Sequence, residues 1–133
     1  MESIKKDAVR GIYISPSVDF DAETGICEIK GESFFEETAK FYAPLLAWIK
    51  DYMKTGKPIT FNIKLTYFNT STSKWILNIL HALREYQENG HKVTVNWYYL
   101  KDDFDMIEEI EDYQSDAGIS INKIEINDEK FFS

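Results

Sequence analysis

The sequence contains little cysteine, proline, glycine and histidine. Its 133 residues include one cysteine, three prolines, six glycines and two histidines. The single cysteine, Cys27, excludes an internal disulfide framework and a zinc site built on cysteines, and it suits a reducing compartment. His81 and His91 do not have the spacing of metal ligands. We therefore expect no metal site and no cofactor.

Bases and long apolar runs are scarce as well. Fifteen basic residues stand against 23 acidic ones, which gives a net charge of −8. This balance disfavours nucleic acid and anionic membranes as partners, because both need a cationic surface. No apolar stretch approaches the roughly 20 residues that cross a bilayer, and residues 1–10 lack the apolar run of a signal peptide. We expect a cytoplasmic protein with one domain over residues 1–133.

The standard catalytic motifs are also missing. The sequence has neither GxxxxGK[ST] nor GxGxxG, the loops that hold nucleotides, and it has no nucleophile elbow. A Ser/His/Asp triad is made of spatial neighbours, so sequence spacing alone does not test for one. These absences favour a protein without an active site.

The apolar residues alternate between two periods along the chain. Strand patterns occupy residues 12–15, 18–20, 26–30, 59–67, 93–99 and 119–126, and helical patterns occupy residues 34–53, 73–89 and 103–117. Pro44 predicts that the first helix starts near Tyr42 or kinks. The last strand changes phase midway, which predicts a bulge or burial on both faces. Tyr67 is expected on the apolar face of residues 59–67.

This order predicts the fold class. A β-hairpin followed by alternating helices and strands favours parallel pairing with right-handed crossovers. We expect a single-domain α/β sandwich with about five strands in a mixed sheet and three main helices, mainly on one face.

One polar cluster separates the clearest strand from the second helix. Asn69, Thr70, Ser71, Thr72 and Ser73 are residue types that cap helix N-termini. A phosphate at this position would meet free backbone N–H groups and the positive end of the helix dipole, with Lys74 as a nearby cation. Plain helix capping is the alternative interpretation.

Two further features suggest contact surfaces. Eight acids and no base lie between Asp102 and Asp116, and they favour either a solvated helix face or the docking of a basic partner at Asp103 and Asp105. Tyr98 and Trp75 are the aromatic residues that we expect on a contact surface, because neighbouring strand residues face opposite ways.

Several segments follow one known sequence pattern. Residues 65–74 resemble the signature YFNTSSSK, residues 15–21 the opening SPxVxFD, and residues 95–99 the strand VxWYY. Together they resemble one bacterial family, the SiaC-type regulatory phosphoproteins. The segments Gly31-Glu32-Ser33, Phe41-Tyr42-Ala43-Pro44-Leu45 with Trp48, and Asp103-Phe104-Asp105-Met106 are also similar to the family pattern, and the resemblance extends over residues 12 to about 115. The sequence departs from the pattern at residues 34–37 and at Thr72.

The resemblance implies a fold like that of anti-sigma-factor antagonists (STAS-like). It implies partner switching in which a protein kinase phosphorylates Thr70 and a phosphatase resets it. The unmodified form would bind and activate a diguanylate cyclase, which links cyclic-di-GMP to biofilm formation and aggregation. Two alternatives stay open: a small hydrolase-type enzyme with Thr70 or Ser71 as nucleophile, and a constitutive scaffolding domain. An exposed Thr70 favours the switch, and a pocket shared with a histidine favours the enzyme.

Overall fold

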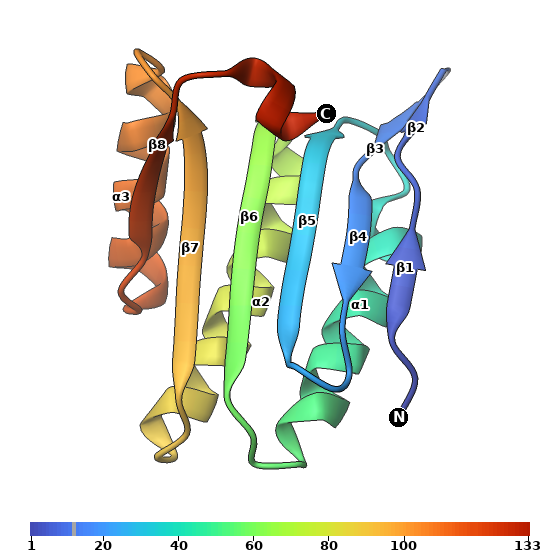
Figure 1. Cartoon of the computed structure of the whole chain (residues 1–133), viewed down its shortest axis with the longest axis vertical. Coiled ribbons are helices and arrows are strands. Elements are labelled where there is room, and N and C mark those ends of the chain that lie inside the picture. Colours follow the sequence, from blue (N-terminus) through green and yellow to red (C-terminus); the bar gives the residue numbers. More distant parts are fainter. Residues whose placement is uncertain (12) are drawn as a thin grey trace.

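The computed structural model describes residues 1–11 and 13–133, and within them a six-stranded mixed sheet forms the centre of the molecule. The strands lie in the order β1-β4-β5-β6-β7-β8 (Figure 1). Their bounds are β1 (Ile4–Lys6), β4 (Ser17–Phe20), β5 (Ile26–Ser33), β6 (Ile59–Phe68), β7 (Val93–Leu100) and β8 (Asn122–Ile126). A separate two-stranded sheet pairs β2 (Val9–Arg10) with β3 (Ile14–Ser15).

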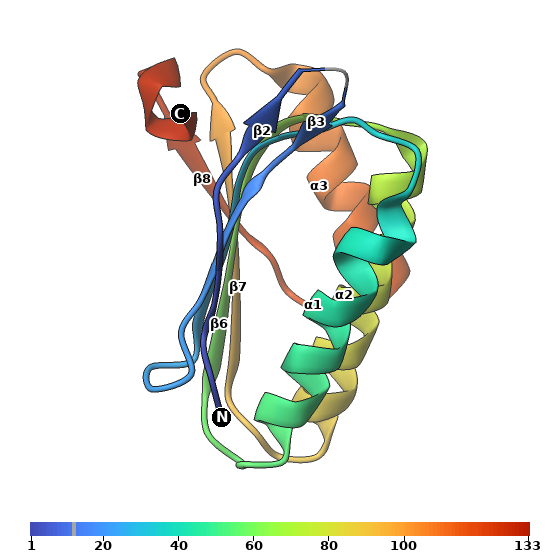
Figure 2. The same ribbon diagram turned by 90° about the vertical axis from the view of Figure 1, so that its right-hand side faces the viewer.

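The helices form a second layer on one face of this sheet. They are α1 (Thr38–Met53), α2 (Thr70–Glu88) and α3 (Phe104–Ala117). Figure 2 shows all three on the same side, as the sequence predicts, while the short 3-10 helix η1 (Glu129–Phe132) lies on the opposite side. Within the described residues, no helix is both long and apolar enough to span a membrane.

Strand pairing follows the predicted order of elements. The β4–β5 hairpin is antiparallel, and the pairs β5–β6, β6–β7 and β7–β8 are parallel. The carboxyl ends of β5, β6 and β7 therefore meet at one edge of the sheet, and α2 and α3 begin at that edge. The segments that follow β5, β6 and β7 therefore lie close together, and they form the candidate site.

The expected count of about five strands is too low by one. The additional strand, β1, pairs antiparallel with β4, with Ile4 opposite Phe20. Its three residues carry one apolar side chain and two lysines, so the sequence shows no strand period there, and lysines are common on exposed edge strands. In the predicted first strand, Ile12 lies outside the described residues.

Two helices start earlier than the sequence predicts. The first, α1, begins at Thr38 and continues through Pro44, so the expected start near Tyr42 is wrong, and the alternative, a kink at Pro44, stays a prediction. Proline has no N–H for the carbonyl of Lys40, and its exposed position leaves that carbonyl accessible to water. The second, α2, begins at Thr70 rather than near Ser73, so most of the hydroxyl cluster belongs to the first turn of the helix.

The last predicted strand shows neither the expected bulge nor full burial on both faces, because β8 pairs with β7 without a register shift and its residues are exposed or half-buried. The observed strand, β8, covers only Asn122–Ile126, and Ile119 and Ile121 are buried in the segment before it. The apolar pattern changes phase because Ile119 and Ile121 are buried in the core before the chain enters β8.

The core between the two layers is rich in aromatic side chains. Its largest fully buried residues include Trp97, Tyr42, Tyr52, Phe20 and Phe61. The predicted apolar face of β6 is buried from Ile59 to Leu65. Cys27 is a core residue, and burial raises the pKa of its thiol, so the thiol stays protonated.

Candidate functional site

The predicted capping cluster lies where β6 ends and α2 begins. Asn69 is the N-cap residue, and its Oδ1 accepts a hydrogen bond from the backbone N–H of Thr72 at 3.0 Å. The same oxygen accepts from the hydroxyl of Ser71 at 3.1 Å. Capping by this cluster is thus confirmed, and one asparagine satisfies both a backbone and a side-chain donor.

Asn69 also connects α2 to the segment that follows β5. Its Nδ2 donates to the carbonyl oxygen of Phe35 at 2.8 Å, and its backbone N–H donates to the carbonyl oxygen of Ser33 at 3.1 Å. The start of α2 is therefore held against a loop that lies more than thirty residues earlier in the chain.

A buried hydroxyl network supports this junction from below. The hydroxyl oxygen of Thr72 lies 2.8 Å from that of Ser33, which lies 2.7 Å from the hydroxyl of Tyr42. Thr72 and Ser33 are 0% exposed. Burial raises the pKa of Tyr42 to about 12, although its two hydroxyl neighbours act in the other direction. The network joins β5, α1 and α2 in the protein interior.

Thr70 differs from the other hydroxyl residues of the cluster. Ser71 donates to Asn69, Thr72 is buried, and Ser73 is hydrogen-bonded to the hydroxyl of Tyr113. Thr70 is exposed at the first residue of α2, and within the described residues its hydroxyl has no hydrogen-bond partner. It is thus the hydroxyl that an external enzyme can reach.

The groups around Thr70 suit an anion. The first N–H groups of a helix have no partner inside the helix, and in the described part of the chain those of Thr70 and Ser71 find none elsewhere. Lys74 is exposed four positions later, on the same helix face as Thr70. A phosphoryl group on Thr70 would therefore meet two backbone donors, the helix dipole and one cation.

Exposed aromatic side chains lie along the same edge, and no motif in the sequence predicts them. Phe34 is 46% exposed and Tyr67 is 55% exposed, and their rings stack with centroids 5.5 Å apart. Phe104, at the start of α3, is 70% exposed. Large apolar groups that gather on a surface mark contact sites more often than isolated ones do.

A β-bulge explains why Tyr67 does not face the core as predicted. The register between β5 and β6 shifts between Gly31 and Glu32, so Glu32 pairs with Tyr67 and Thr66 is left over. Beyond this extra residue, Phe68 turns to the core and packs near Trp97, while Tyr67 faces outward. The alternation of apolar residues in the sequence does not indicate that Tyr67 and Phe68 exchange faces.

A groove of about 690 Å³ lies next to these aromatic residues. Its walls include Tyr13, Phe34, Phe35 and Phe41, together with Lys6, Lys40, Glu36 and Glu37. Residues 34–37, where the sequence departs from the family pattern, thus form part of a surface groove, and Asn69 binds the backbone of that same segment.

The other predicted contact residues do not join Thr70. Trp75 packs partly against the core, and Tyr98 lies near Phe131, with ring centroids 5.3 Å apart. Asp103 caps α3 by accepting from the N–H of Met106 at 3.1 Å. Asp105 is exposed in the first turn of α3. The pKa of Glu109 on α3 is raised, first by partial burial of its carboxyl and then by the nearby carboxylates of the same acidic segment.

The histidines lie away from the cluster. His81 is exposed eleven residues along α2 from Thr70, which is about 16 Å of helix, and His91 stacks on Tyr86 beyond the other end of that helix. Thr70 lines none of three prominent surface grooves of the described residues. In the same residues, no three His, Cys, Asp or Glu side chains gather as metal ligands would.

Known proteins share both sequence and fold with this chain. The family model described as "SiaC family regulatory phosphoprotein" matches residues 9–126. An uncharacterized protein of Pseudomonas aeruginosa strain UCBPP-PA14 is 25% identical over 111 residues, which cover 83% of this chain and 88% of that protein.

Two crystal structures show the same fold. One is the Pseudomonas aeruginosa diguanylate cyclase SiaD in complex with its activator SiaC; a chain of it matches with a TM-score of 0.82 and 21% identity, over 91% of this chain and 100% of that chain. The other, apo-SiaC of Pseudomonas aeruginosa, matches with a TM-score of 0.78 and 21% identity, over 93% and 99%. Because the family model covers most of the sequence, the chain belongs to the SiaC family of regulatory phosphoproteins.

Proposed function

We propose that this protein is a binding module switched by phosphorylation of Thr70, and that its effector is a diguanylate cyclase. The observation that carries the proposal is that the hydroxyls of the cluster differ. The Thr70 hydroxyl is exposed and has no hydrogen bond in the described part of the chain. A kinase would therefore reach Thr70 without disturbing the cap. The cyclase is inferred from the structural neighbour that contains SiaD with its activator SiaC.

The phosphorylated form should keep its fold. Phosphorylation adds a charge of about −1.5 to −2 and three acceptor oxygens. The free N–H groups of Thr70 and Ser71 and the ammonium of Lys74 are available to this charge. A negative group in the first turn also interacts favourably with the helix dipole. The modification thus changes the surface and leaves the helix in place.

The same charge should release an effector that covers Thr70. The neighbouring aromatic residues Phe34, Tyr67 and Phe104 favour an apolar contact, and an apolar contact would have to desolvate the phosphate. Burying a charge without a matched partner costs several kcal/mol. We therefore expect the unmodified protein to bind its effector and the phosphorylated protein to release it.

The proposal has consequences for the whole chain. Residues 1–133 would act as one regulatory domain with a kinase and a phosphatase as further partners, in the cytoplasm, where a kinase finds its ATP. The alternation of strands and helices supports the relation to anti-sigma-factor antagonists that the resemblance implies. We propose no catalytic activity, since Thr70 and Ser71 lie far from the histidine of α2 that would serve as a base. We favour the switch over a constitutive scaffold because Thr70 is exposed at the start of α2, where a kinase can reach its hydroxyl.

Phosphotransfer and binding assays test the switch. We expect the cognate kinase to modify the wild-type protein and Ser71→Ala, the matched control, but not Thr70→Ala. Calorimetry should show that Thr70→Ala binds the cyclase as the unmodified wild type does. The enzymatically phosphorylated protein should bind at least about tenfold more weakly, which corresponds to 1.4 kcal/mol. Equal binding of the two forms would show that the direction is wrong.

The aromatic edge is tested in the same binding assay. Tyr67→Ala should weaken binding of the cyclase. Ile26→Ala is the matched control, because Ile26 is also exposed but lies at the amino end of β5, at the other edge of the sheet. An equal loss of affinity in both variants would contradict a contact at the Thr70 edge.

A further inference from the structure

The sheet face opposite the helices is open along most of its length. The four strands β5 to β8 are parallel, and the three α-helices cover only one of their faces (Figure 2). Parallel sheets are usually covered on both faces. The open face of this protein is therefore an unusual surface.

The middle of the open face is polar, and its asparagine amides bond to one another. Asn122 donates through its side-chain amide to Asn96, and Asn96 donates to Asn62, each at 2.9 Å. This amide ladder crosses three strands, and its polar groups offer little driving force for an apolar ligand.

The part nearer the carboxyl ends has a different chemistry. Lys64 and Tyr98 lie on neighbouring strands, and the ammonium of Lys64 lies 2.5 Å from a carboxylate oxygen of Glu28 and 5.2 Å from the centre of the Tyr98 ring. We call Lys64, Thr66, Tyr98 and Leu100 the Lys64–Tyr98 surface. It combines a cation with aromatic and aliphatic groups.

The C-terminal segment of the chain is seated on this surface. The ring of Phe131 lies 5.3 Å from that of Tyr98 and 4.8 Å from the Lys64 ammonium, and Phe132 is only 5% exposed. The ammonium thus faces two aromatic rings, an arrangement that favours aromatic over aliphatic occupants. The seated segment shows which side chains this surface accepts.

This segment lies beyond the part of the chain that the family model matches. The family match ends at residue 126, and η1 follows after only Asn127 and Asp128. It is a single 3-10 turn, capped by Asp128 through the N–H of Lys130 at 2.9 Å. A short turn held mainly by two rings can leave the sheet while the helices and strands stay in place.

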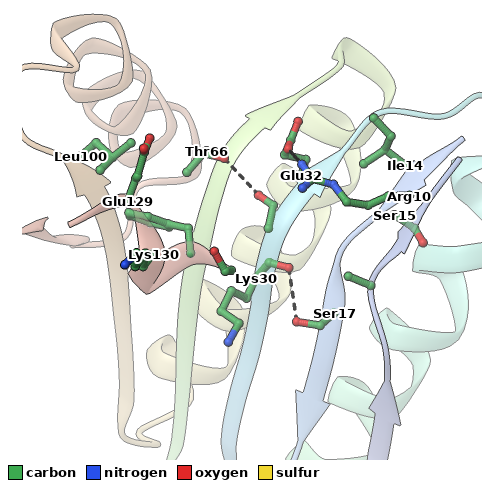
Figure 3. A pocket seen from close by; sticks show the side chains of 14 residues that line it. Arg10, Ile14, Ser15, Ser17, Lys30, Glu32, Thr66, Leu100, Glu129 and Lys130 are labelled. Carbon is green, nitrogen blue, oxygen red and sulfur yellow. Dashed lines mark hydrogen bonds and ion pairs between the residues drawn. The ribbon is translucent and has the colours of Figure 1, made fainter.

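Space for a longer occupant continues beside the turn. A groove of about 670 Å³ separates η1 from the β2–β3 sheet, and Figure 3 shows Lys30, Ser17 and Thr66 along it. Arg10 is paired with Glu32, whereas Lys30 has no ion pair among the described residues. A segment that carries a carboxylate would therefore find a cation there.

We propose that the Lys64–Tyr98 surface is a second interaction site, which takes a partner segment with two neighbouring aromatic side chains and a carboxylate, and that residues Asp128–Phe132 occupy it in cis as a competitor. A tethered competitor lowers the apparent affinity of every ligand in proportion to the time that the site is occupied. The site is on the open face rather than at the start of α2, so it does not rest on the function of Thr70.

A peptide with the sequence of residues 127–133, labelled with a fluorophore, tests this inference by anisotropy. The full-length variant F131A/F132A should bind the peptide about tenfold more tightly than the wild type does, if the wild-type turn is seated nine-tenths of the time. Adding Tyr98→Ala to the variant should abolish binding, whereas adding Tyr13→Ala, at an exposed ring outside the surface, should not.

Circular dichroism is used to show that F131A/F132A is folded. If this variant does not fold, Phe131→Ala alone takes its place, because Phe131 is the less buried of the two rings. Equal affinity of the wild type and the variant for the peptide would overturn the proposal. Peptide binding that survives Tyr98→Ala, or no binding by the folded variant, would overturn it as well.

Discussion

At the scale of the residue, Thr70 and Thr72 show how position within one helical turn decides the role of a side chain. Thr70 is exposed, and Thr72 is buried within 2.8 Å of Ser33. The two have the same hydroxyl chemistry, so only the packing beneath the turn makes one a candidate phosphosite and the other a structural residue.

The buried network predicts a stability loss at high pH. Burial raises the pKa of Tyr42 from 10.0 to about 12. A raised pKa in the folded state contributes stability that is complete below pH 10 and is lost as the pH rises through 12, at up to about 1.4 kcal/mol per pH unit. We expect the free energy of unfolding, measured with urea, to fall between pH 10 and pH 12.

Tyr42→Phe should make that fall smaller. The variant loses the hydrogen bond to Ser33, so we expect it to be less stable by about 1 kcal/mol at neutral pH. Burial also raises the pKa of Tyr113 and of the Cys27 thiol, so part of the fall should remain. Tyr67→Phe, at an exposed ring, is the matched control. A fall of the same size in Tyr42→Phe and in the wild type would contradict this explanation.

At the scale of the element, the start of α2 depends on one residue. Asn69 accepts from Thr72 and Ser71 and donates to Phe35. Loss of an N-cap side chain costs about 1 kcal/mol, and the orphaned carbonyl of Phe35 should add to this cost. We therefore expect Asn69→Ala to lower the free energy of unfolding by about 1 to 2 kcal/mol in urea titrations.

The same helix contains a matched control. Asn78 is exposed in the middle of α2, where alanine is the better helix former, so Asn78→Ala should be neutral or stabilising by about 0.5 kcal/mol. Similar losses in the two variants would mean that the cap contributes nothing specific.

At the scale of the whole molecule, the core accounts for the fold without a ligand. Its two layers enclose a continuous apolar cluster, and the described residues gather no set of metal ligands. We expect thermal unfolding to give the same Tm with and without a chelator, and phosphorylation of Thr70 to leave the Tm nearly unchanged. A large drop in Tm on chelation would reveal a metal site.

The three main helices and the order of the strands from β4 to β8 could be predicted from the sequence, because they depend on local periodicity. The strict alternation in residues 59–65 and the helical spacing from Ile76 to Tyr86 place apolar side chains on one face whatever the neighbouring segments are. The Asn69–Ser73 cluster was predictable for the same reason, since capping acts within a single turn.

Other features depend on contacts between distant segments, and only the tertiary structure decided them. The pairing of β1 with β4, the bulge that turns Tyr67 outward, and the seat of Phe131 on Tyr98 all join residues far apart in the chain. Pro44 stays inside α1 because tertiary packing overrides its local preference. Thr70 is the accessible hydroxyl because Asn69, Ser33 and Tyr113 engage the hydroxyls of its neighbours. Nonlocal packing leaves no periodic signal, so the sequence determined the elements and the tertiary structure determined their exposed surfaces.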